Sequence, residues 1–264
     1  MKNIGIIPVR MGSSRFPGKP MELIQGIPMV AHVYFRCKMS RELDEVFVAT
    51  CDKEIFDYIT SIGGKAVMTA DTHERCTDRT AECLLKVEQA LGHKMELVVM
   101  IQGDEPMIYP EMIDDSVVPM RNDPAIEVVN LMAPLLTKEE HEDPNEVKVV
   151  VDGRGNALYF SREPVPSRKK GAKNIPMFKQ VCVIPFRRDF LIKFNQLEPT
   201  PLEIVESVDM LRVLEHGYRV RMVLTDQTTY SVDTREDLQV VEEAMTEDPL
   251  VAKYKDRAEQ GELV

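Results

Sequence analysis

The segment that follows the first apolar run of the chain is rich in groups that bind phosphate. Residues 10–20 read RMGSSRFPGKP and contain three cations, two hydroxyls and two glycines. Backbone N–H groups and cationic side chains in such a loop can converge on one polyphosphate. The spacing matches neither a Walker loop, GxxxxGK[ST], nor a GxGxxG dinucleotide fingerprint. The alternative interpretation is a basic surface loop with glycine turns.

Two acidic positions farther along the chain suit a hard cation such as magnesium. Asp104 lies in IQGDEP directly after an apolar run, where the preceding Gly103 would let the backbone approach a ligand. Asp233 lies in SVDTREDL. Both have structural alternatives, because Gly-Asp is common in turns and Asp233 or Thr234 could cap the helix that follows. Asp233 as a metal ligand with Thr234 as the helix cap satisfies both roles.

A cationic loop and two carboxylates together describe a site for metal-assisted nucleotidyl transfer. Magnesium on the phosphates would neutralise developing charge and align an attacking oxygen with the α-phosphorus. The whole chain is acidic, with 33 Lys and Arg against 44 Asp and Glu and a formal net charge of −11. A nucleic-acid-binding protein is therefore disfavoured, and an anionic ligand must be held by a local group of cations.

The segments between these residues alternate between strand and helix patterns. Continuous Ile/Val runs suit strands that are buried on both faces, and apolar residues three or four apart indicate helices. The order predicts an α/β fold with a mostly parallel central sheet flanked by helices. The loop at residues 10–20 then follows the carboxyl end of the first strand, where such sheets bind ligands. The predicted strands are residues 3–8, 45–50 and 97–101, and the predicted helices are residues 28–38, 53–61 and 80–91.

From about Ile126 the pattern changes to strands joined by turns. Residues 146–151 and 156–160 flank a Gly-containing turn and predict a β-hairpin. We expect one domain over residues 1–264, with an insertion at about 145–190. The other predicted elements are a helix at 201–216, a strand at 220–225, a last helix at 235–245, and a mobile basic loop at 164–176 that is either solvated or in contact with substrate.

Composition narrows the class of protein further. With 44% hydrophobic, 29% charged and 6% aromatic residues, the chain is neither a structureless tail nor a coiled coil. No apolar run approaches the roughly 20 residues of a membrane-spanning helix, and the N-terminus does not resemble a signal peptide, so we expect a cytoplasmic protein. The five cysteines contain no CxxC pair, and we expect most to be small core residues. No histidine is assigned to a metal, although His73 could reach the nucleotide loop.

Six stretches of the chain resemble, in order, the bacterial 3-deoxy-manno-octulosonate (KDO) cytidylyltransferases. They are IPVRMGSSRFPGKP, TADTHERCTDRTAE, IQGDEPMI, PNEVKVVVDGRGNALYFSREPVP, TPLEIVESVDMLRVLEHGYRV and SVDTREDL. The resemblance extends from Ile4 to about Met245. It implies a Rossmann-like nucleotidyltransferase that moves CMP from CTP to the anomeric hydroxyl of an acidic sugar and releases pyrophosphate. It also implies magnesium as cofactor and a homodimer, with the insertion contributing to dimerisation and to the sugar site.

The resemblance carries roles over to individual positions. Arg162 would meet the carboxylate of the sugar acid through its planar fork. Without the resemblance, Glu203 and Glu206 would be interpreted as a solvated helix face. The implied catalytic residues are Arg10, Lys19 and Asp104; the implied nucleotide-binding residues are Arg10, Met11, Gly12, Ser13, Ser14, Arg15, Lys19, Arg79, Gln102 and Gly103; the implied acceptor-binding residues are Arg162, Gln180, Glu203 and Glu206; and the implied metal ligands are Asp104 and Asp233.

Several positions depart from the family pattern. The family's RHLGIYGYR is KQVCVIPFR at residues 179–187, so that Gln180 replaces a histidine, and its EQLR is DMLR at residues 209–212. A sugar hydroxyl left unpaired by such changes would cost about 1–3 kcal/mol. Cys76 replaces the glycine of SGT[DE]R, and if that glycine needs a positive φ the loop must differ locally.

The sequence therefore predicts KDO or a close variant, such as an amino-KDO, as the acceptor. A different acid or a phosphonate is the first alternative. The second is a catalytically silent nucleotide-binding protein on the same scaffold, which the retained Arg10, Lys19 and Asp104 disfavour.

Overall fold

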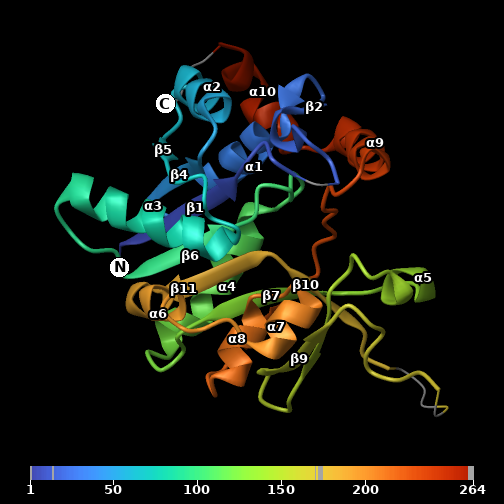
Figure 1. Cartoon of the computed structure of the whole chain (residues 1–264). Helices are drawn as coiled ribbons and strands as arrows, with labels where there is room; N and C mark the ends of the chain where they lie inside the picture. Colours follow the sequence, from blue (N-terminus) through green and yellow to red (C-terminus); the bar gives the residue numbers. More distant parts are fainter. Residues whose placement is uncertain (1, 14, 170, 172–174, 261–264) are drawn as a thin grey trace. The chain divides into compact units, whose positions relative to one another are not determined.

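The computed structural model describes residues 2–13, 15–169, 171 and 175–260 (Figure 1). The chain divides into two compact units. The first contains Met1–Asp114 and Thr229–Val264, and the second contains Asp115–Thr228. No helix among the described residues is both long and apolar enough to cross a membrane.

The first unit is built on parallel strands. They stand in the order β6 (Leu97–Ile101), β1 (Asn3–Val9), β4 (Glu45–Thr50) and β5 (Ala66–Met68). Each neighbouring pair is parallel, and β1 is buried along its whole length. This burial explains the continuous apolar runs in the sequence, and it confirms the predicted strands and their parallel order.

Three helices make the crossovers between these strands. They are α1 (Met29–Lys38), α2 (Lys53–Ser61) and α3 (Cys76–Leu91). The crossovers through α1 and α2 run in one direction along the sheet, and the crossover through α3 runs back past β1. Because such crossovers are right-handed, α3 covers the face opposite to α1 and α2. Helix α3 starts four residues before the predicted helix, and Gly92 ends it at φ 72°.

The first unit also contains a short antiparallel pair of strands near the N-terminus and the helices at the C-terminus. Helix α10 comes after the helix that the sequence suggested would be the last. The elements are η1 (Lys19–Met21), β2 (Leu23–Ile24), β3 (Ile27–Pro28), α9 (Arg235–Ala244), η2 (Met245–Glu247) and α10 (Val251–Gln260), and α4 (Pro110–Asn122) contains the boundary with the second unit.

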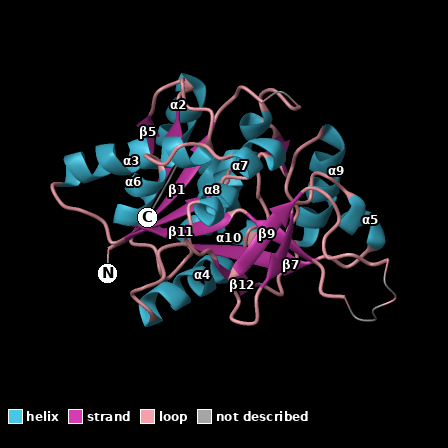
Figure 2. Cartoon of the chain, turned by 60° about the horizontal axis from the view of Figure 1, so that its bottom comes forward, coloured by secondary structure: helices cyan, strands magenta, loops and turns pink. Residues whose placement is uncertain are grey.

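The second unit contains a mixed sheet, part of which is labelled in Figure 2. The predicted hairpin is confirmed, since β8 and β9 pair antiparallel. Asp152 Oδ1 fixes the turn by accepting the N–H groups of Arg154 and Asn156, both at 2.8 Å. The strand order is β12 (Arg221–Leu224), β7 (Val129–Pro134), β10 (Phe178–Val181), β8 (Lys148–Val151) and β9 (Ala157–Ser161), and the unit also contains α5 (Lys138–Glu142), β11 (Val183–Arg187) and α6 (Arg188–Phe194).

Two predictions about this unit can be compared with the structure. The single helix expected at 201–216 is wrong, because the segment forms α7 (Pro201–Glu206) and α8 (Met210–Glu215). Ser207 separates them with a left-handed backbone at φ 54°, which an α-helix does not contain. In the basic loop expected at 164–176, residues 170 and 172–174 lie outside the described part of the chain.

No disulfide joins the five cysteines, all of which lie in the described part of the chain. Cys37 and Cys83 are buried, whereas Cys51, Cys76 and Cys182 are partly exposed. The expectation that most of them are core residues is therefore wrong.

Candidate active site

The loop after β1 is folded back on itself by its own backbone. The carbonyl of Met11 accepts the N–H groups of Ser13 and Gly18, both at 3.0 Å, and Gly18 has the positive φ of 79° that this return requires. Asp52, which precedes α2, accepts the N–H of Met11 at 2.8 Å. Phe16 is buried beneath the loop. These contacts fix the loop against the carboxyl ends of β1 and β4.

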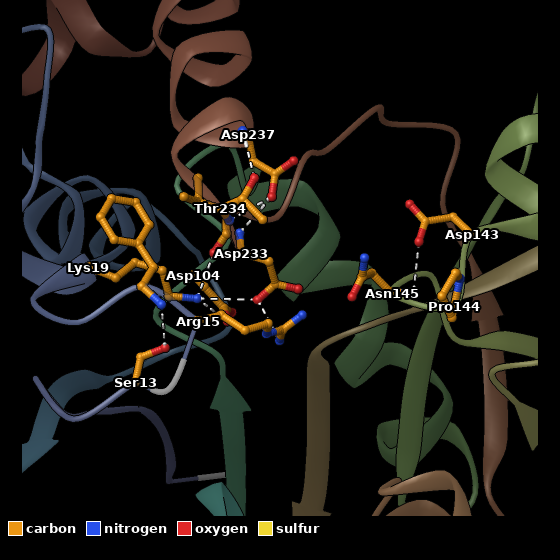
Figure 3. A network of polar contacts seen from close by, with 12 residues as sticks. Ser13, Arg15, Lys19, Asp104, Asp143, Pro144, Asn145, Asp233, Thr234 and Asp237 are labelled. Carbon is orange, nitrogen blue, oxygen red and sulfur yellow. Dashed lines mark hydrogen bonds and ion pairs between the residues drawn. The ribbon is translucent and has the colours of Figure 1, made fainter.

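Lys19 is the centre of an ion-pair cluster in this unit (Figure 3). Its Nζ donates to Asp104 Oδ2 at 3.0 Å and to the carbonyl of Val232 at 2.6 Å, and it lies 3.5 Å from Asp233 Oδ1. Arg15 Nη2 is 2.8 Å from the same Asp233 oxygen. The N–H of Val232 donates to the carbonyl of Asp104 at 2.9 Å, which joins the two acidic segments. The structure thus brings together three segments that lie far apart in the sequence, residues 15–19, 104 and 232–233.

Thr234 and Asp237 form the N-terminal cap of α9. Thr234 Oγ1 accepts the N–H of Asp237 at 3.2 Å, and Asp237 Oδ2 accepts the N–H groups of Asp233 and Thr234. The predicted cap at Thr234 is confirmed. The side chain of Asp233 is left to face Lys19 and Arg15, as Figure 3 shows.

Gly103 is required by packing between β1 and β6. A side chain there would place its Cβ 2.1 Å from Cγ1 of Val9, a distance that no real contact tolerates. This reason differs from the ligand approach that the sequence suggested. The neighbouring Gln102 is partly exposed, Gly12 is exposed, and Ser14 lies outside the described residues.

The donor set at Asp104 and Asp233 fits magnesium. Two hard carboxylates face the same point, because both contact Lys19 Nζ. Within the described residues there is no group of three or more His, Cys, Asp or Glu that could hold a metal by itself. Magnesium in nucleotide enzymes is commonly bound by one or two carboxylates together with substrate phosphates, so two carboxylates suffice.

Arg10 and Arg79 belong to a second cluster of the same unit. Arg10 Nη1 donates to the carbonyl of His73 at 3.4 Å, so His73 contacts this loop through its main chain, while its ring contacts Glu82. Arg79 is 3% exposed and donates through Nη1 to Thr69 Oγ1 and to the carbonyl of Ala70 at 3.2 Å. Its Nη2 has no hydrogen-bond partner among the described residues.

Cys76 causes no backbone strain where the family has glycine. It is the first residue of α3, and the described non-glycine residues with a positive φ are Gln25 and Ser207. The local change that the sequence made conditional on a positive φ is therefore not needed.

Asp52 is a site residue that the sequence analysis missed. It follows β4 as Asp104 follows β6, and the carboxyl ends of parallel strands meet at one edge of a sheet. A polar residue directly after each predicted strand was the signal that could have identified it.

In the second unit, Arg162 is held by the main chain. Its Nε donates to the carbonyl of Glu206 at 2.6 Å and its Nη1 to the carbonyl of Pro144 at 2.9 Å. The Glu206 side chain in turn accepts the N–H of Arg162 at 2.8 Å and the hydroxyl of Tyr159 at 3.0 Å. A carboxylate that Arg162 binds must use Nη2 or displace one of these carbonyls.

Glu203 is buried and paired with Arg212. The guanidinium donates from Nε to Glu203 Oε2 at 2.7 Å and from Nη2 to Oε1 at 2.5 Å. Glu206 is also buried, and the exposed side chains of α7 are instead Leu202, Ile204 and Val205. The interpretation of the two glutamates as a solvated helix face is wrong.

Gln180 is oriented by a buried asparagine. Its Nε2 donates to Asn130 Oδ1 at 2.6 Å, while Asn130 Nδ2 donates to the carbonyls of Leu131 and Val181. Because both donors of Asn130 are used, its oxygen must face Gln180 and the Gln180 amide must donate. Ile184 and Met210, at two other positions that depart from the family pattern, are buried.

Comparison with known proteins settles the family. A family model described as Cytidylyltransferase matches residues 4–227. The chain belongs to the cytidylyltransferase family. A protein of Syntrophotalea carbinolica named 3-deoxy-manno-octulosonate cytidylyltransferase is 42% identical over 250 residues, which cover 92% of this chain and 98% of that protein. One of the same name from Fusobacterium nucleatum is 40% identical over 91% of this chain and 96% of its own.

Solved structures agree with this assignment. The CTP complex of a CMP:2-keto-3-deoxy-manno-octonic acid synthetase superposes with a TM-score of 0.87 at 38% identity, covering 94% of this chain and all of that one. A cytidylyltransferase of Leptospira borgpetersenii, 15% identical with a TM-score of 0.63, shares the fold. This cytidylyltransferase is thus a nucleotidyltransferase enzyme with a central sheet flanked by helices.

Proposed function

We propose that this cytidylyltransferase transfers CMP from CTP to the anomeric hydroxyl of a 3-deoxy-2-ulosonic acid, with magnesium as cofactor. KDO or a close variant such as an amino-KDO is the proposed acceptor. The observation that carries the proposal is Lys19, which lies between Asp104 and Asp233 at the end of a cationic loop. The names of the relatives, which specify KDO, support the choice of acceptor.

The proposed reaction is a displacement at the α-phosphorus of CTP. The anomeric oxygen forms a bond to this phosphorus, the bond from the phosphorus to the bridging β-phosphate oxygen breaks, and pyrophosphate leaves with the electron pair. The hydroxyl proton is released to solvent. Asp104 and Asp233 would hold magnesium, which supplies positive charge to the phosphates when bound.

Lys19, Arg15 and Arg10 contribute the chain's own positive charge. Lys19 is fixed by three oxygen acceptors, and a cation that is already oriented stabilises developing negative charge without reorganisation during the reaction. Arg15 contacts Asp233 Oδ1 beside Lys19, and its side chain is exposed, so a phosphate can reach it. The nucleotide role of Met11, Gly12, Ser13, Gln102 and Gly103 stays part of this proposal.

In the second unit, Arg162 is proposed to bind the acceptor's carboxylate. Its Nε and Nη1 are held by main-chain carbonyls, which immobilises the guanidinium before the acceptor binds. Glu206 contributes by anchoring Arg162, and Gln180 offers an amide oriented by Asn130 in place of the family's histidine. This amide favours an acceptor that differs from KDO in one polar group, since histidine and glutamine present different donors.

A pyrophosphate-release screen tests the proposal. CTP and UTP are each offered with KDO, an amino-KDO, a sialic acid and a phosphonate, with and without magnesium. We expect release only with CTP paired with KDO or the amino-KDO, and only with magnesium. Faster release with a phosphonate or an unrelated acid contradicts the acceptor. No release with any pair, together with CTP binding, indicates a silent nucleotide-binding protein.

We also propose a homodimer in the cytoplasm, with residues 145–190 contributing to the interface.

A further inference from the structure

Glu82, on α3, fastens the segment that joins β5 to this helix. Its Oε2 accepts the N–H of Ala70 at 2.9 Å and also contacts His73 Nε2. Lys86, one turn farther along α3, lies 2.7 Å from Glu82 Oε1 and donates to the carbonyl of Met68 at 2.7 Å. One carboxylate and one ammonium of α3 therefore hold the start and the middle of residues 68–73.

The same segment carries the carbonyl groups that position two guanidinium groups. Ala70 accepts from Arg79 Nη1 at 3.2 Å, and His73 accepts from Arg10 Nη1 at 3.4 Å. Glu82 thus contacts the N–H of Ala70 and the ring of His73, while the carbonyls of these two residues face Arg79 and Arg10. A displacement of the segment would move both guanidinium groups together.

Arg79 is an independent indication that a ligand binds beside residues 68–73 and offers a hydrogen-bond acceptor there. It is 3% exposed, and its Nη2 has no hydrogen-bond partner among the described residues. A buried donor on a cation is costly when it is unpaired, and such a group in a native protein calls for an explanation. An acceptor atom on a bound nucleotide would satisfy it.

Glu82 is ionised at neutral pH. Burial alone would raise its pKa, but hydrogen bonds from Lys86, the N–H of Ala70 and His73 outweigh burial and lower the pKa to about 2. An ionised acceptor forms stronger hydrogen bonds than a neutral one. An amide at this position would keep the shape of the side chain and lose this strength.

We propose that Glu82 is a positioning residue for the nucleotide: it holds residues 68–73 so that Arg10 and Arg79 bind CTP, with Arg79 Nη2 donating to the nucleotide. This inference rests on the proposed function, because it concerns the affinity for CTP. Glu82 touches neither substrate, so its effect falls on nucleotide binding and leaves the acceptor's affinity unchanged.

Glu82→Gln and Glu88→Gln form a matched pair for the test. Glu88 lies on the same helix, and its Oε1 accepts the N–H of Met95 at 2.9 Å, which is the same kind of bond to a different loop. For Glu82→Gln we expect a rise in the KM for CTP of about tenfold, a lower kcat because Arg10 is displaced as well, and an acceptor KM within about twofold of wild type. For Glu88→Gln all three constants stay within about twofold. Amide hydrogen exchange of Ala70 speeds up in Glu82→Gln alone.

The outcomes separate this inference from the proposed function. Wild-type protein that releases no pyrophosphate from CTP refutes both. Active wild type with equal CTP KM values for the two variants overturns the role of Glu82, as does an equal rise in the KM for CTP and for the acceptor. If Glu82→Gln does not fold, Lys86→Met is the second variant. It removes the ion pair with Glu82 and the hydrogen bond to the carbonyl of Met68. It must then raise the KM for CTP and not that for the acceptor, and an unchanged KM for CTP overturns the inference.

Discussion

At the scale of single residues, the site depends on a buried cation with more than one partner. Lys19 is 9% exposed, and two carboxylates and a carbonyl share its ammonium. Removing one partner of a buried ion pair leaves a charge without compensation. A substitution in this cluster can therefore lower both stability and turnover, and an informative variant must keep an acceptor for Lys19.

Asp104→Asn is such a variant, because its amide oxygen can still accept from Lys19. It removes the negative charge proposed to bind magnesium, and we expect kcat/KM to fall by about 100-fold or more. The measurement is magnesium-dependent pyrophosphate release, accompanied by a thermal unfolding curve. Asp57→Asn is the control, because Asp57 is an exposed carboxylate that pairs with Lys53 on α2. Near-wild-type activity of Asp104→Asn contradicts the role in metal binding.

The site residues that were predicted from the sequence differ from the missed ones in the kind of contact they make. Lys19 and Asp104 were predictable because each follows a strand whose carboxyl end the parallel order brings to one edge, and Asp233 was predictable from its place beside the N-cap of α9 and from the family resemblance. Asp52 could have been predicted from its place after β4, but Glu82 could not, because its role is to accept a main-chain N–H of another segment, and such a contact leaves no motif. The burial of Glu203 was also not predictable, since its partner Arg212 is on another helix.

At the scale of elements, prediction succeeded where burial imposes a pattern. Strands β1 and β6 are buried along their whole length, and β4 is buried except at Glu45. Helices α1 and α2 begin within one residue of their predicted starts. Helix α10 was missed, because its sequence VAKYKDRAEQ has few apolar residues. Its buried residues within the described part are Val251 and Tyr254, and two positions are too few to produce a clear periodicity.

Tyr254 docks α10 through a directional chain of hydrogen bonds. His32 Nε2 lies 2.8 Å from the carbonyl of Ile24, so this nitrogen must carry the proton. His32 Nδ1 is then the acceptor for the Tyr254 hydroxyl at 2.8 Å, and that hydroxyl accepts from Arg36 Nε at 3.1 Å. Arg36 also donates to Asp248 at 2.6 Å. This series of hydrogen bonds requires a neutral His32.

This requirement predicts a loss of stability on acidification. Burial, with Arg36 nearby, lowers the pKa of His32 from 6.5 to about 4. Between these values the unfolded chain binds a proton that the folded protein does not, so the free energy of unfolding falls as pH drops from 6.5 to 4. The loss is on the order of 2–3 kcal/mol.

Urea unfolding at pH 7, 6, 5 and 4 measures this loss. His32→Gln, which can still donate to Ile24, should be less stable than wild type at pH 7 and show a smaller decrease with acid. His93→Gln is the control, because His93 is partly exposed, lies in the turn after α3 and takes no part in the hydrogen bonds around Tyr254. It should leave the wild-type slope unchanged. An identical pH slope in wild type and His32→Gln refutes the prediction.

At the scale of the whole molecule, the proposed roles divide between the two units. The residues proposed for CTP and magnesium are in the first unit, and those proposed for the acceptor are in the second. The chain enters the second unit inside α4 and leaves it at Thr228, and neither point has the Gly, Pro or Ser content of a linker. The division therefore could not be predicted from composition. The net charge of −11 belongs to the molecule as a whole, while the cations of the site are local.

The proposed homodimer can be tested by measuring the mass of the protein in solution and by substituting a residue of the proposed interface. Light scattering after gel filtration should give about twice the 30.1 kDa of the chain. Leu158, on β9 within residues 145–190, is 61% exposed, and a large exposed aliphatic group on a sheet favours an interface. Leu158→Glu should shift the mass toward 30.1 kDa, because a charge cannot be buried there without a partner. Leu224→Glu, on β12 and outside that segment, should not. A monomeric wild type contradicts the proposed homodimer. A dimeric Leu158→Glu variant shows that Leu158 on β9 is not part of the interface.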